Sequence, residues 1–308
     1  MNPTKRAVAI MGATATGKSD LAIRMAEEFD GEIVSMDSCQ VYRGFDIGTG
    51  KVTPADRRRI PHHLIDTLDP HEGNSAGAHA ARAEKASGEI LTRGKTPFFV
   101  GGTGLYFRVL FHGIIDVSIP GDESKRLRQT LAGQSTAELY ENLRQIDAGR
   151  SAALSPRDRV RILRAIEIRL LTGKTHSEHI ARQKRGAAWD GLKIVLTLPR
   201  AELRKRIAER TREMYRKGWV DEVRSLLARG AGLDAPAMKS LGYEVIARAI
   251  VEHTDPDATV ETVITLTQQY AKRQETFFRS EPDAHWIDVS TSGTDETLRR
   301  LFRTHCGL

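Results

Sequence analysis

The sequence predicts an α/β protein with a parallel-sheet core that is interrupted by an all-helical insertion domain. In the first third of the 308 residues, short apolar runs alternate with amphipathic helical stretches. From about residue 113 to residue 190 the pattern is helical with charged faces, and after it an apolar strand pattern returns. Short apolar strands separated by helices are typical of a parallel sheet covered on both faces. We therefore expect a core of residues 1–112 and 191–308 and an insertion of residues 113–190.

The core elements follow from apolar spacing and from glycines and prolines at their ends. Before the insertion we expect strands at 6–11, 32–36 and 97–100 and helices at 18–28 and 76–92. After it we expect strands at 192–198 and 285–289, helices at 201–217, 219–229, 240–252 and 257–279, and a closing helix. Within the insertion, Ser155 followed by Pro156 predicts the start of a helix, with the serine as its cap.

Composition narrows the class of protein. With 40% hydrophobic and 28% charged residues, the chain has the composition of a globular protein. It holds no run near the ~20 apolar residues that cross a bilayer, so we expect no membrane association. Its 2 cysteines, Cys39 and Cys306, are far apart, which favours a reducing, cytoplasmic setting over a disulfide. We expect a monomer.

The net charge of +7 is concentrated in the insertion. Residues 157–185 contain nine Lys or Arg against three Asp or Glu, a net of +6. One interpretation is a solvated helix face, which is the usual meaning of a charge run. The other is a surface for a polyanion such as RNA or DNA. The charge run alone leaves both open.

The segment Gly12-Ala13-Thr14-Ala15-Thr16-Gly17-Lys18-Ser19 fits the phosphate-loop pattern G-x-x-x-x-G-K-[ST]. It lies between an apolar strand and a helix, as that pattern requires. Glycines let the backbone fold around an anion, the N–H groups at the helix start point toward it, Lys18 supplies charge, and the Ser19 hydroxyl can ligate Mg²⁺. A P-loop NTPase-like core is therefore expected.

A carboxylate follows the second predicted strand, at Asp37. In an NTPase an acid at the end of a neighbouring strand helps to position Mg²⁺. The strand that ends in Val100 is followed by Gly101-Gly102-Thr103 and has no such acid. Asp37 is thus either a metal-positioning group or a base directed at a substrate beside the phosphates, and the residues alone leave both roles open.

Five segments together resemble one family. They are the phosphate loop, Asp37–Arg43 with Asp46–Thr49, Val100–Tyr106, Ser240–Tyr243, and Tyr270–Gln274. In this order and spacing the chain resembles the bacterial tRNA dimethylallyltransferases, the IPP transferase family, over nearly its whole length. The resemblance implies transfer of a dimethylallyl group from dimethylallyl diphosphate to N6 of adenosine 37, in tRNAs that read codons beginning with U.

The resemblance also implies roles for individual residues. Asp37 matches the base that accepts a proton from the amine, Thr103 matches a residue that contacts the target nucleotide, and Lys18 and Ser19, with Mg²⁺, match the groups that neutralise the diphosphate. Thr103 has a plainer interpretation as a turn residue. The implied diphosphate-binding residues are Gly12, Ala13, Thr14, Ala15, Thr16, Gly17, Lys18, Ser19, Arg206 and Arg210, although an exposed basic face is the alternative for the two arginines.

The tRNA is the polyanion that the basic insertion requires. Because N6 is reached only when the base leaves its stack, we expect the nucleotide to be extruded into a channel. The implied tRNA-binding residues are Asp37, Ser38, Cys39, Gln40, Thr103, Arg126, Arg161, Ile162, Leu163, Arg164, Ala165, Lys239, Ser240, Leu241, Gly242, Tyr243 and Glu244.

Three other functions compete with this one. A small-molecule kinase would use the same loop for ATP, with Asp37 activating a hydroxyl. An adenylate isopentenyltransferase would prenylate a free nucleotide and would not need the insertion. A non-catalytic RNA-binding module would not need Lys18, Ser19 and Asp37 together.

Overall fold

The computed structural model describes residues 6–113, 121–182 and 189–306, and the chain forms two compact units. The first unit comprises Met1–His112 and Ala187–Leu308, and the second is Gly113–Gly186. The second unit ends at residue 186, before the end of the predicted insertion at residue 190, because Trp189 is buried in the core of the first unit and a strand begins at Asp190. No described helix is long and apolar enough to span a bilayer.

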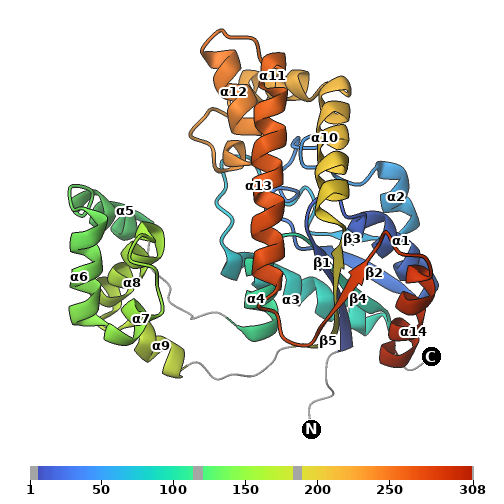
Figure 1. Cartoon of the computed structure of the whole chain (residues 1–308), viewed down its shortest axis with the longest axis horizontal. Helices are drawn as coiled ribbons and strands as arrows, with labels where there is room; N and C mark the ends of the chain where they lie inside the picture. Colours follow the sequence, from blue (N-terminus) through green and yellow to red (C-terminus); the bar gives the residue numbers. More distant parts are fainter. Residues whose placement is uncertain (1–5, 114–120, 183–188, 307–308) are drawn as a thin grey trace. The chain divides into compact units, whose positions relative to one another are not determined.

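The first unit is built on a six-stranded sheet in the order β3-β2-β4-β1-β5-β6, in which every neighbouring pair is parallel (Figure 1). The strands are β1 (Arg6–Gly12), β2 (Gly31–Ser35), β3 (His62–His63), β4 (Thr96–Gly101), β5 (Asp190–Thr197) and β6 (Ala284–Asp288). The predicted α/β fold with a P-loop NTPase-like parallel sheet is confirmed. Five of the strands were predicted within two residues, whereas the two-residue β3 was missed.

Helices cover both faces of the sheet. Along β1, Val8 and Ile10 point to one face and Ala7, Ala9 and Met11 to the other, as the period of two in a strand requires. The first face packs against α1 (Lys18–Glu28) and α14 (Thr294–Cys306), and the second against α3 (Ala76–Thr92) and α4 (Gly104–His112). Both faces of β1 are therefore shielded from water by helices, and this packing holds the strand and the start of the loop that follows it in place.

A further group of helices stands beyond the carboxyl ends of the strands. It consists of α10 (Arg200–Arg216), α11 (Trp219–Ala228), η1 (Pro236–Lys239), α12 (Tyr243–Val251), η2 (Asp257–Thr259) and α13 (Val260–Phe278). A short helix, α2 (Pro54–Arg59), lies nearer the sheet (Figure 1). Figure 1 shows α10 and α13 side by side. The apolar core of this group of helices includes Trp219, Tyr243 and Phe45. The helix predicted from residue 240 begins only at Tyr243, because Gly242 adopts a φ of 87°.

The insertion unit has its own apolar core, formed by Leu139, Leu143, Ile162 and Ile166 among others. Its helices are α5 (Gly121–Thr130), α6 (Thr136–Ile146), α7 (Ala148–Ala152), α8 (Arg159–Thr172) and α9 (His176–Arg182). The helix start predicted at Ser155 was wrong. Residues 155–158 form a turn, and the Asp158 side chain caps α8 by accepting the Arg161 N–H.

Candidate functional site

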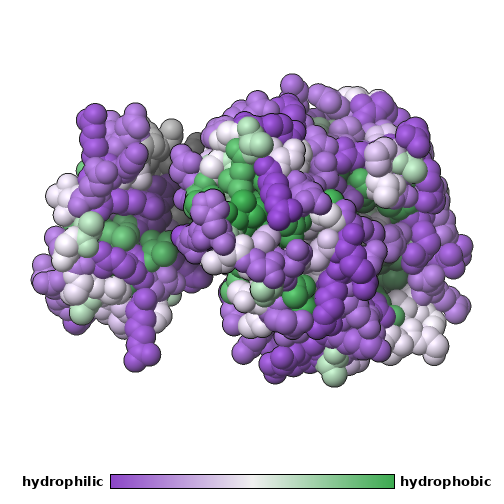
Figure 2. Space-filling model, turned by 90° about the horizontal axis from the view of Figure 1, so that it is seen from above, coloured by the Kyte–Doolittle hydropathy of each residue, from purple (hydrophilic) through white to green (hydrophobic). Residues whose placement is uncertain are grey.

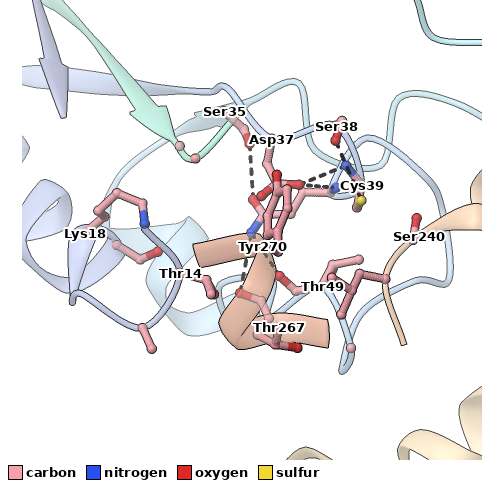
Figure 3. A pocket seen from close by; sticks show the side chains of 18 of the residues that line it. Thr14, Lys18, Ser35, Asp37, Ser38, Cys39, Thr49, Ser240, Thr267 and Tyr270 are labelled. Carbon is pink, nitrogen blue, oxygen red and sulfur yellow. Dashed lines mark hydrogen bonds between the residues drawn. The ribbon is translucent and has the colours of Figure 1, made fainter. Parts of the chain in front are cut away.

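A cavity of about 510 Å³ opens at the carboxyl ends of β1, β2 and β4. In open α/β sheets this is where ligands bind. Side chains from separate segments converge on the cavity, among them Lys18 from the phosphate loop, Asp37 after β2, Arg210 from α10 and Tyr270 from α13 (Figure 3). The site therefore joins the strand ends to the helices that stand beyond them.

The phosphate loop has the backbone conformation that an anion site needs. Gly12 has a φ of 145°, and a Cβ at this position would lie 2.5 Å from the Leu196 carbonyl oxygen. Ala15 and Gly17 also have positive φ angles, 64° and 84°. Gly17 caps α1 without a side-chain hydrogen bond, so the first N–H groups of the helix are left for a ligand.

Some predicted loop groups are already engaged within the protein. The Thr16 hydroxyl donates to the Ala13 carbonyl at 2.8 Å, and the side chain of Thr16 is buried. The Thr14 N–H donates to Gln274 Oε1 at 2.9 Å. The predicted residues whose side chains border the cavity are Thr14, Ala15, Lys18 and Ser19. The remaining loop residues shape the backbone.

Lys18 is buried, and opposing effects act on its pKa. Its Nζ donates to the Ala13 carbonyl at 2.5 Å. Burial and the nearby positive charge of Arg210 lower the pKa of Lys18 to about 7, although the charge of Asp37 opposes that shift. Burial likewise lowers the pKa of Arg210, whose Nη1 donates to the Thr14 hydroxyl at 3.0 Å. Two cations that are buried at the loop indicate a site for a strongly anionic group.

Asp37 borders the same cavity from the end of β2. Its Oδ1 accepts the N–H groups of Cys39 at 2.8 Å and Gln40 at 3.3 Å, which fixes the orientation of the carboxylate. No donor to the second oxygen, Oδ2, is found in the described parts of the chain. That oxygen is available to accept a proton or hydrogen bond from a ligand.

Thr103 lies beside the Asp37 segment, since its hydroxyl accepts the Ser38 N–H at 3.1 Å. Thr103 is not itself among the residues that border the cavity, and it reaches the site through this contact with Ser38, which does border it. Gln40, predicted to bind tRNA, is held internally: its Oε1 accepts from the Ser35 hydroxyl at 3.1 Å, and its Nε2 donates to the Thr49 carbonyl at 3.3 Å. In this arrangement the Gln40 amide holds the 48–50 loop in place.

The Ser240–Glu244 segment supplies both lining and support. Lys239, Ser240 and Leu241 border the cavity, and Lys239 is exposed. Tyr243 also borders it but is fully buried, with its hydroxyl donating to Glu222 at 2.6 Å and accepting the Gly48 N–H at 3.0 Å.

Two predicted residues of the first unit point elsewhere. Arg206 does not border this cavity, and its Nε donates to Glu202 at 3.0 Å on the same helix. Glu244 likewise pairs with Arg248 at 2.8 Å.

The residue-level prediction assigned no role to α13, although its Tyr270–Gln274 segment was part of the resemblance. Thr267, Tyr270, Arg273 and Gln274 all border the cavity. Gln274 is buried, and its Nε2 donates to the Gly102 carbonyl at 2.9 Å while its Oε1 holds the phosphate loop. The i, i+3, i+7 spacing of Thr267, Tyr270 and Gln274 is the signal in the sequence that could have placed them on one helix face.

In the insertion unit, several basic residues are engaged within the unit. Glu167 is fully buried and pairs with Arg128 and, at 3.4 Å, with Arg164. Arg159 donates to carbonyl groups after α5, including that of Gln134 at 2.7 Å, and Arg169 donates to the Gly173 carbonyl. Much of the predicted positive charge therefore stabilises the unit itself.

Other residues of the insertion unit remain at its surface. Arg126 is exposed, and the Arg161 side chain is 68% exposed while it pairs with Asp158 at 3.3 Å. Ile162 and Ala165 are buried and Leu163 is half-buried. Ile162 and Ala165 therefore pack in the core of the unit and do not lie at its surface. Residues 183–185 of the basic stretch, and the side chain of Arg182, lie outside the described residues. Figure 2 shows hydrophilic side chains over most of one face of each unit.

Comparison with known proteins identifies the family. The sequence model of "IPP transferase" matches residues 40–281. The chain is 41% identical to tRNA dimethylallyltransferase 2 of Geotalea uraniireducens over 92% of this chain and 93% of that protein, and 41% identical to tRNA dimethylallyltransferase of Geobacter sulfurreducens over 91% of each. The chain belongs to the IPP transferase family. The predicted assignment to the tRNA dimethylallyltransferases, and with it that of a prenyl-transferring enzyme, is confirmed.

Solved structures of IPP transferases have the same fold. The tRNA isopentenylpyrophosphate transferase of Bacillus halodurans superposes with a TM-score of 0.72 at 31% identity, over 98% of this chain and 97% of that one. A eukaryotic dimethylallyltransferase, described as acting on tRNA, superposes with a TM-score of 0.77 at 27% identity, over 97% of this chain and 78% of that one. These matches favour the family assignment over the kinase, adenylate-prenylating and non-catalytic alternatives.

Proposed function

We propose that this IPP transferase moves the dimethylallyl group of dimethylallyl diphosphate to the N6 amine of adenosine 37, in tRNAs that read codons beginning with U. The observation that supports this most strongly is the cavity itself. The phosphate loop, together with the buried cations Lys18 and Arg210, borders one part of the cavity, and Asp37 borders another part. The reaction requires an anion site and a proton acceptor that face a common space.

The donor half of the reaction requires the loss of diphosphate. The bond between C1 of the dimethylallyl group and the diphosphate oxygen breaks, and the oxygen keeps the electron pair. Lys18, Arg210 and the free N–H groups at the start of α1 would neutralise the charge that develops there. Because Lys18 titrates near pH 7 in the free protein, diphosphate favours its charged form and is bound with proton uptake at higher pH.

Mg²⁺ fits the donor half as a partner of the diphosphate. No cluster of three or more His, Cys, Asp or Glu suited to a metal occurs among the described residues, but the Ser19 side chain lies at the cavity beside Lys18. Mg²⁺ commonly takes one protein oxygen together with phosphate oxygens and waters. Ser19 would hold the ion, which would add positive charge at the diphosphate.

The acceptor half requires help because an adenine amine is a poor nucleophile. Its nitrogen lone pair is delocalised into the ring, and the nitrogen must lose a proton as the new C–N bond forms. Asp37, fixed through Oδ1 by two backbone N–H groups, would accept that proton on Oδ2. Thr103, one hydrogen bond from the Asp37 segment, would hold the target nucleotide near this carboxylate.

The nucleic acid would be bound by exposed groups on both units. Lys239 on the first unit and Arg126 and Arg161 on the insertion are exposed and carry positive charge. Contacts of this kind bind the phosphate backbone and hold the RNA while one base enters the cavity. A tRNA acceptor supports a cytoplasmic enzyme, and we propose that it acts as a monomer.

A transfer assay tests the proposed function. The protein is incubated with labelled dimethylallyl diphosphate, Mg²⁺ and an unmodified tRNA that reads a codon beginning with U. The same tRNA with guanosine at position 37, AMP and ATP serve as alternative acceptors. We expect label on the first tRNA alone, released by nuclease digestion as N6-dimethylallyladenosine, and no transfer after chelation of Mg²⁺. Label on AMP, or on the guanosine 37 tRNA, would refute the proposal.

A further inference from the structure

Tyr270 is an aromatic side chain at the cavity to which the proposed function gives no role. It lies on α13 and borders the cavity together with Thr267, one turn earlier, and Gln274, one turn later. Figure 3 shows its ring projecting from the helix toward Asp37. The ring therefore stands on the acceptor side of the site, where a nucleobase would have to enter.

Two features hold Tyr270 in place. Its hydroxyl interacts electrostatically with Thr103, whose own hydroxyl accepts the Ser38 N–H. The helix beneath it is tied at Gln274, which bonds both to the phosphate loop and to the Gly102 carbonyl. Burial and the charge of Asp37 raise the pKa of Tyr270 well above its usual value, so the hydroxyl stays protonated near neutral pH. The ring is a fixed flat surface.

A cation accompanies this ring. The guanidinium carbon of Arg273 lies 5.7 Å from the centroid of the Tyr270 ring, and Arg273 is exposed. Within the described residues, Arg273 forms no ion pair with an acid. An aromatic ring next to a cation is the combination that proteins use to bind single-stranded nucleotides, with the ring against a base and the cation near a phosphate.

A flipped base needs such a surface. Taking a nucleotide out of its stack costs a few kcal/mol, and enzymes that do so recover much of that cost by stacking the base on aromatic or apolar side chains. If the adenine amine contacts Asp37 and Thr103, the edge of the purine that carries the amine lies next to the Tyr270 hydroxyl. The purine and the tyrosine ring then lie alongside each other in the same cavity.

We propose that Tyr270 is the stacking wall of the acceptor site, against whose ring the face of the extruded adenine packs while Asp37 and Thr103 hold its amine. This inference rests on the proposed function. Tyr270 then contributes to tRNA affinity and to the position of the base through its ring, and its hydroxyl serves to hold the ring upright. It contributes nothing to diphosphate binding.

Two substitutions separate the ring from the hydroxyl. Tyr270→Phe keeps the stacking surface, and we expect its Kd for tRNA to stay within about threefold of the unsubstituted protein. Tyr270→Leu removes the flat ring, and we expect its Kd for tRNA to rise at least about fivefold, as for the loss of one stacked base. The KM for dimethylallyl diphosphate should be unchanged in both. Tyr215→Phe, which removes a tyrosine hydroxyl bonded to Thr259 away from the cavity, is the matched control.

A spectroscopic measurement reports stacking directly. A tRNA with 2-aminopurine at position 37 lacks the N6 amine, so it binds without reacting, and its fluorescence is quenched when the base stacks. We expect strong quenching with the unsubstituted protein and with Tyr270→Phe, and brighter bound fluorescence with Tyr270→Leu. Thermal melting of each variant shows whether it is folded, and Tyr270→Met provides a second non-aromatic side chain of similar size.

Two results would overturn the proposal. One is equal fluorescence of the bound 2-aminopurine with tyrosine and with leucine or methionine at position 270. The other is a loss in Tyr270→Phe as large as that in Tyr270→Leu, which would assign the effect to the hydroxyl. Failure of the proposed function itself gives a different result, because the unsubstituted protein would then not prenylate tRNA at adenosine 37.

Discussion

At the cavity of the first unit the cations Lys18 and Arg210 are withdrawn from water, whereas the arginines of the insertion unit lie at or near its surface. Lys18 has a pKa lowered to about 7, and Arg210 donates to Thr14 within the cavity. In the insertion, Arg161 is mostly exposed, and Arg128 and Arg164 are half-exposed while they neutralise a buried acid. The same kinds of side chain therefore serve different purposes in the two units.

This difference shows that a run of positive charge is not a measure of RNA affinity. A cation that already bonds to Glu167 or to the carbonyl groups at a helix end has its strongest interaction inside the protein. A cation such as Arg161 or Arg126, at the surface, can exchange its counterions for a phosphate. Substitutions should therefore affect chemistry in the first unit, and either stability or affinity in the second, according to the partner of each residue.

The largest effect is expected at Asp37. Asp37→Asn keeps an oxygen that can accept the Cys39 and Gln40 N–H groups, but the amide does not accept the proton of the amine. We expect kcat to fall by about 10²–10⁴, with Kd for tRNA unchanged. Single-turnover transfer and filter binding measure the two quantities. Asp69→Asn, at a surface ion pair with Arg43, is the control, and near-normal turnover of Asp37→Asn would contradict the base assignment.

The next effect concerns stability of the insertion. Arg128→Ala leaves the fully buried Glu167 with Arg164, at 3.4 Å, as its remaining charged partner among the residues that the structure describes. Because Arg128 itself is half-exposed, we expect a loss of about 2 kcal/mol rather than the larger cost of a fully buried pair. Arg126→Ala, on the same helix and exposed, should change stability by less than about 0.5 kcal/mol. Urea unfolding measures both, and the comparison fails if the two variants are equally stable.

A pH dependence should separate the buried lysine from the surface arginines. Lys18 has a pKa of about 7 in the free protein, and a bound diphosphate raises it, so binding requires proton uptake above pH 7. Donor affinity is then fully present below pH 7 and falls by about tenfold per pH unit above it, until the pKa of the complex is reached. Calorimetry in buffers of different ionisation enthalpy measures the proton uptake. Lys18→Arg does not titrate in this range, and a parallel pH profile in that variant would exclude Lys18 as the cause.

The smallest effect is expected at Arg161. Arg161→Ala removes one exposed cation, so we expect Kd for tRNA to rise by a few-fold and the slope of log K against log salt to fall by about 0.7–0.9. The kcat at saturating tRNA should not change. Arg144→Ala, which removes an exposed arginine paired with Glu141 on α6, is the matched control. A fall in kcat without a change in Kd would show that Arg161 acts in the chemistry.

Much of the fold was predicted from the sequence because its signals are local. A strand buried on both faces, such as β1 or β4, is a short apolar run, and the bounds of α1 and α3 follow from helical spacing. β3 was missed because two histidines carry no strand pattern, and they are held by pairing with β2. The start of α8 was misplaced because Ser155-Pro156 forms a turn that precedes the true cap.

The candidate site divides in a similar way. Gly12–Ser19 is contiguous, and its spacing specifies both the backbone shape and the cation, so the conformation of the loop was predictable, whereas the internal bonds of the Thr14 N–H and the Thr16 hydroxyl were not. The role of Gln40 was not, because its amide meets Ser35 and Thr49 only after the 48–50 loop folds back. Arg206 and Arg210 share one helix and one residue type. Tertiary packing sends Arg210 to the cavity, whereas Arg206 pairs with Glu202, one turn earlier on the same helix.

The order of residues by itself determined five of the six strands, the phosphate loop and the presence of Asp37 at a strand end, because hydrophobic periodicity and glycine positions act over a few neighbouring residues. Tertiary structure alone decided which charges are buried, which arginines remain exposed, and that Tyr270 from α13 meets Thr103 after β4. Those outcomes depend on contacts between segments that are distant in the sequence, such as Arg210 with Thr14 and Arg128 with Glu167, and burial, which sets the pKa of Lys18, exists only once such segments have packed together.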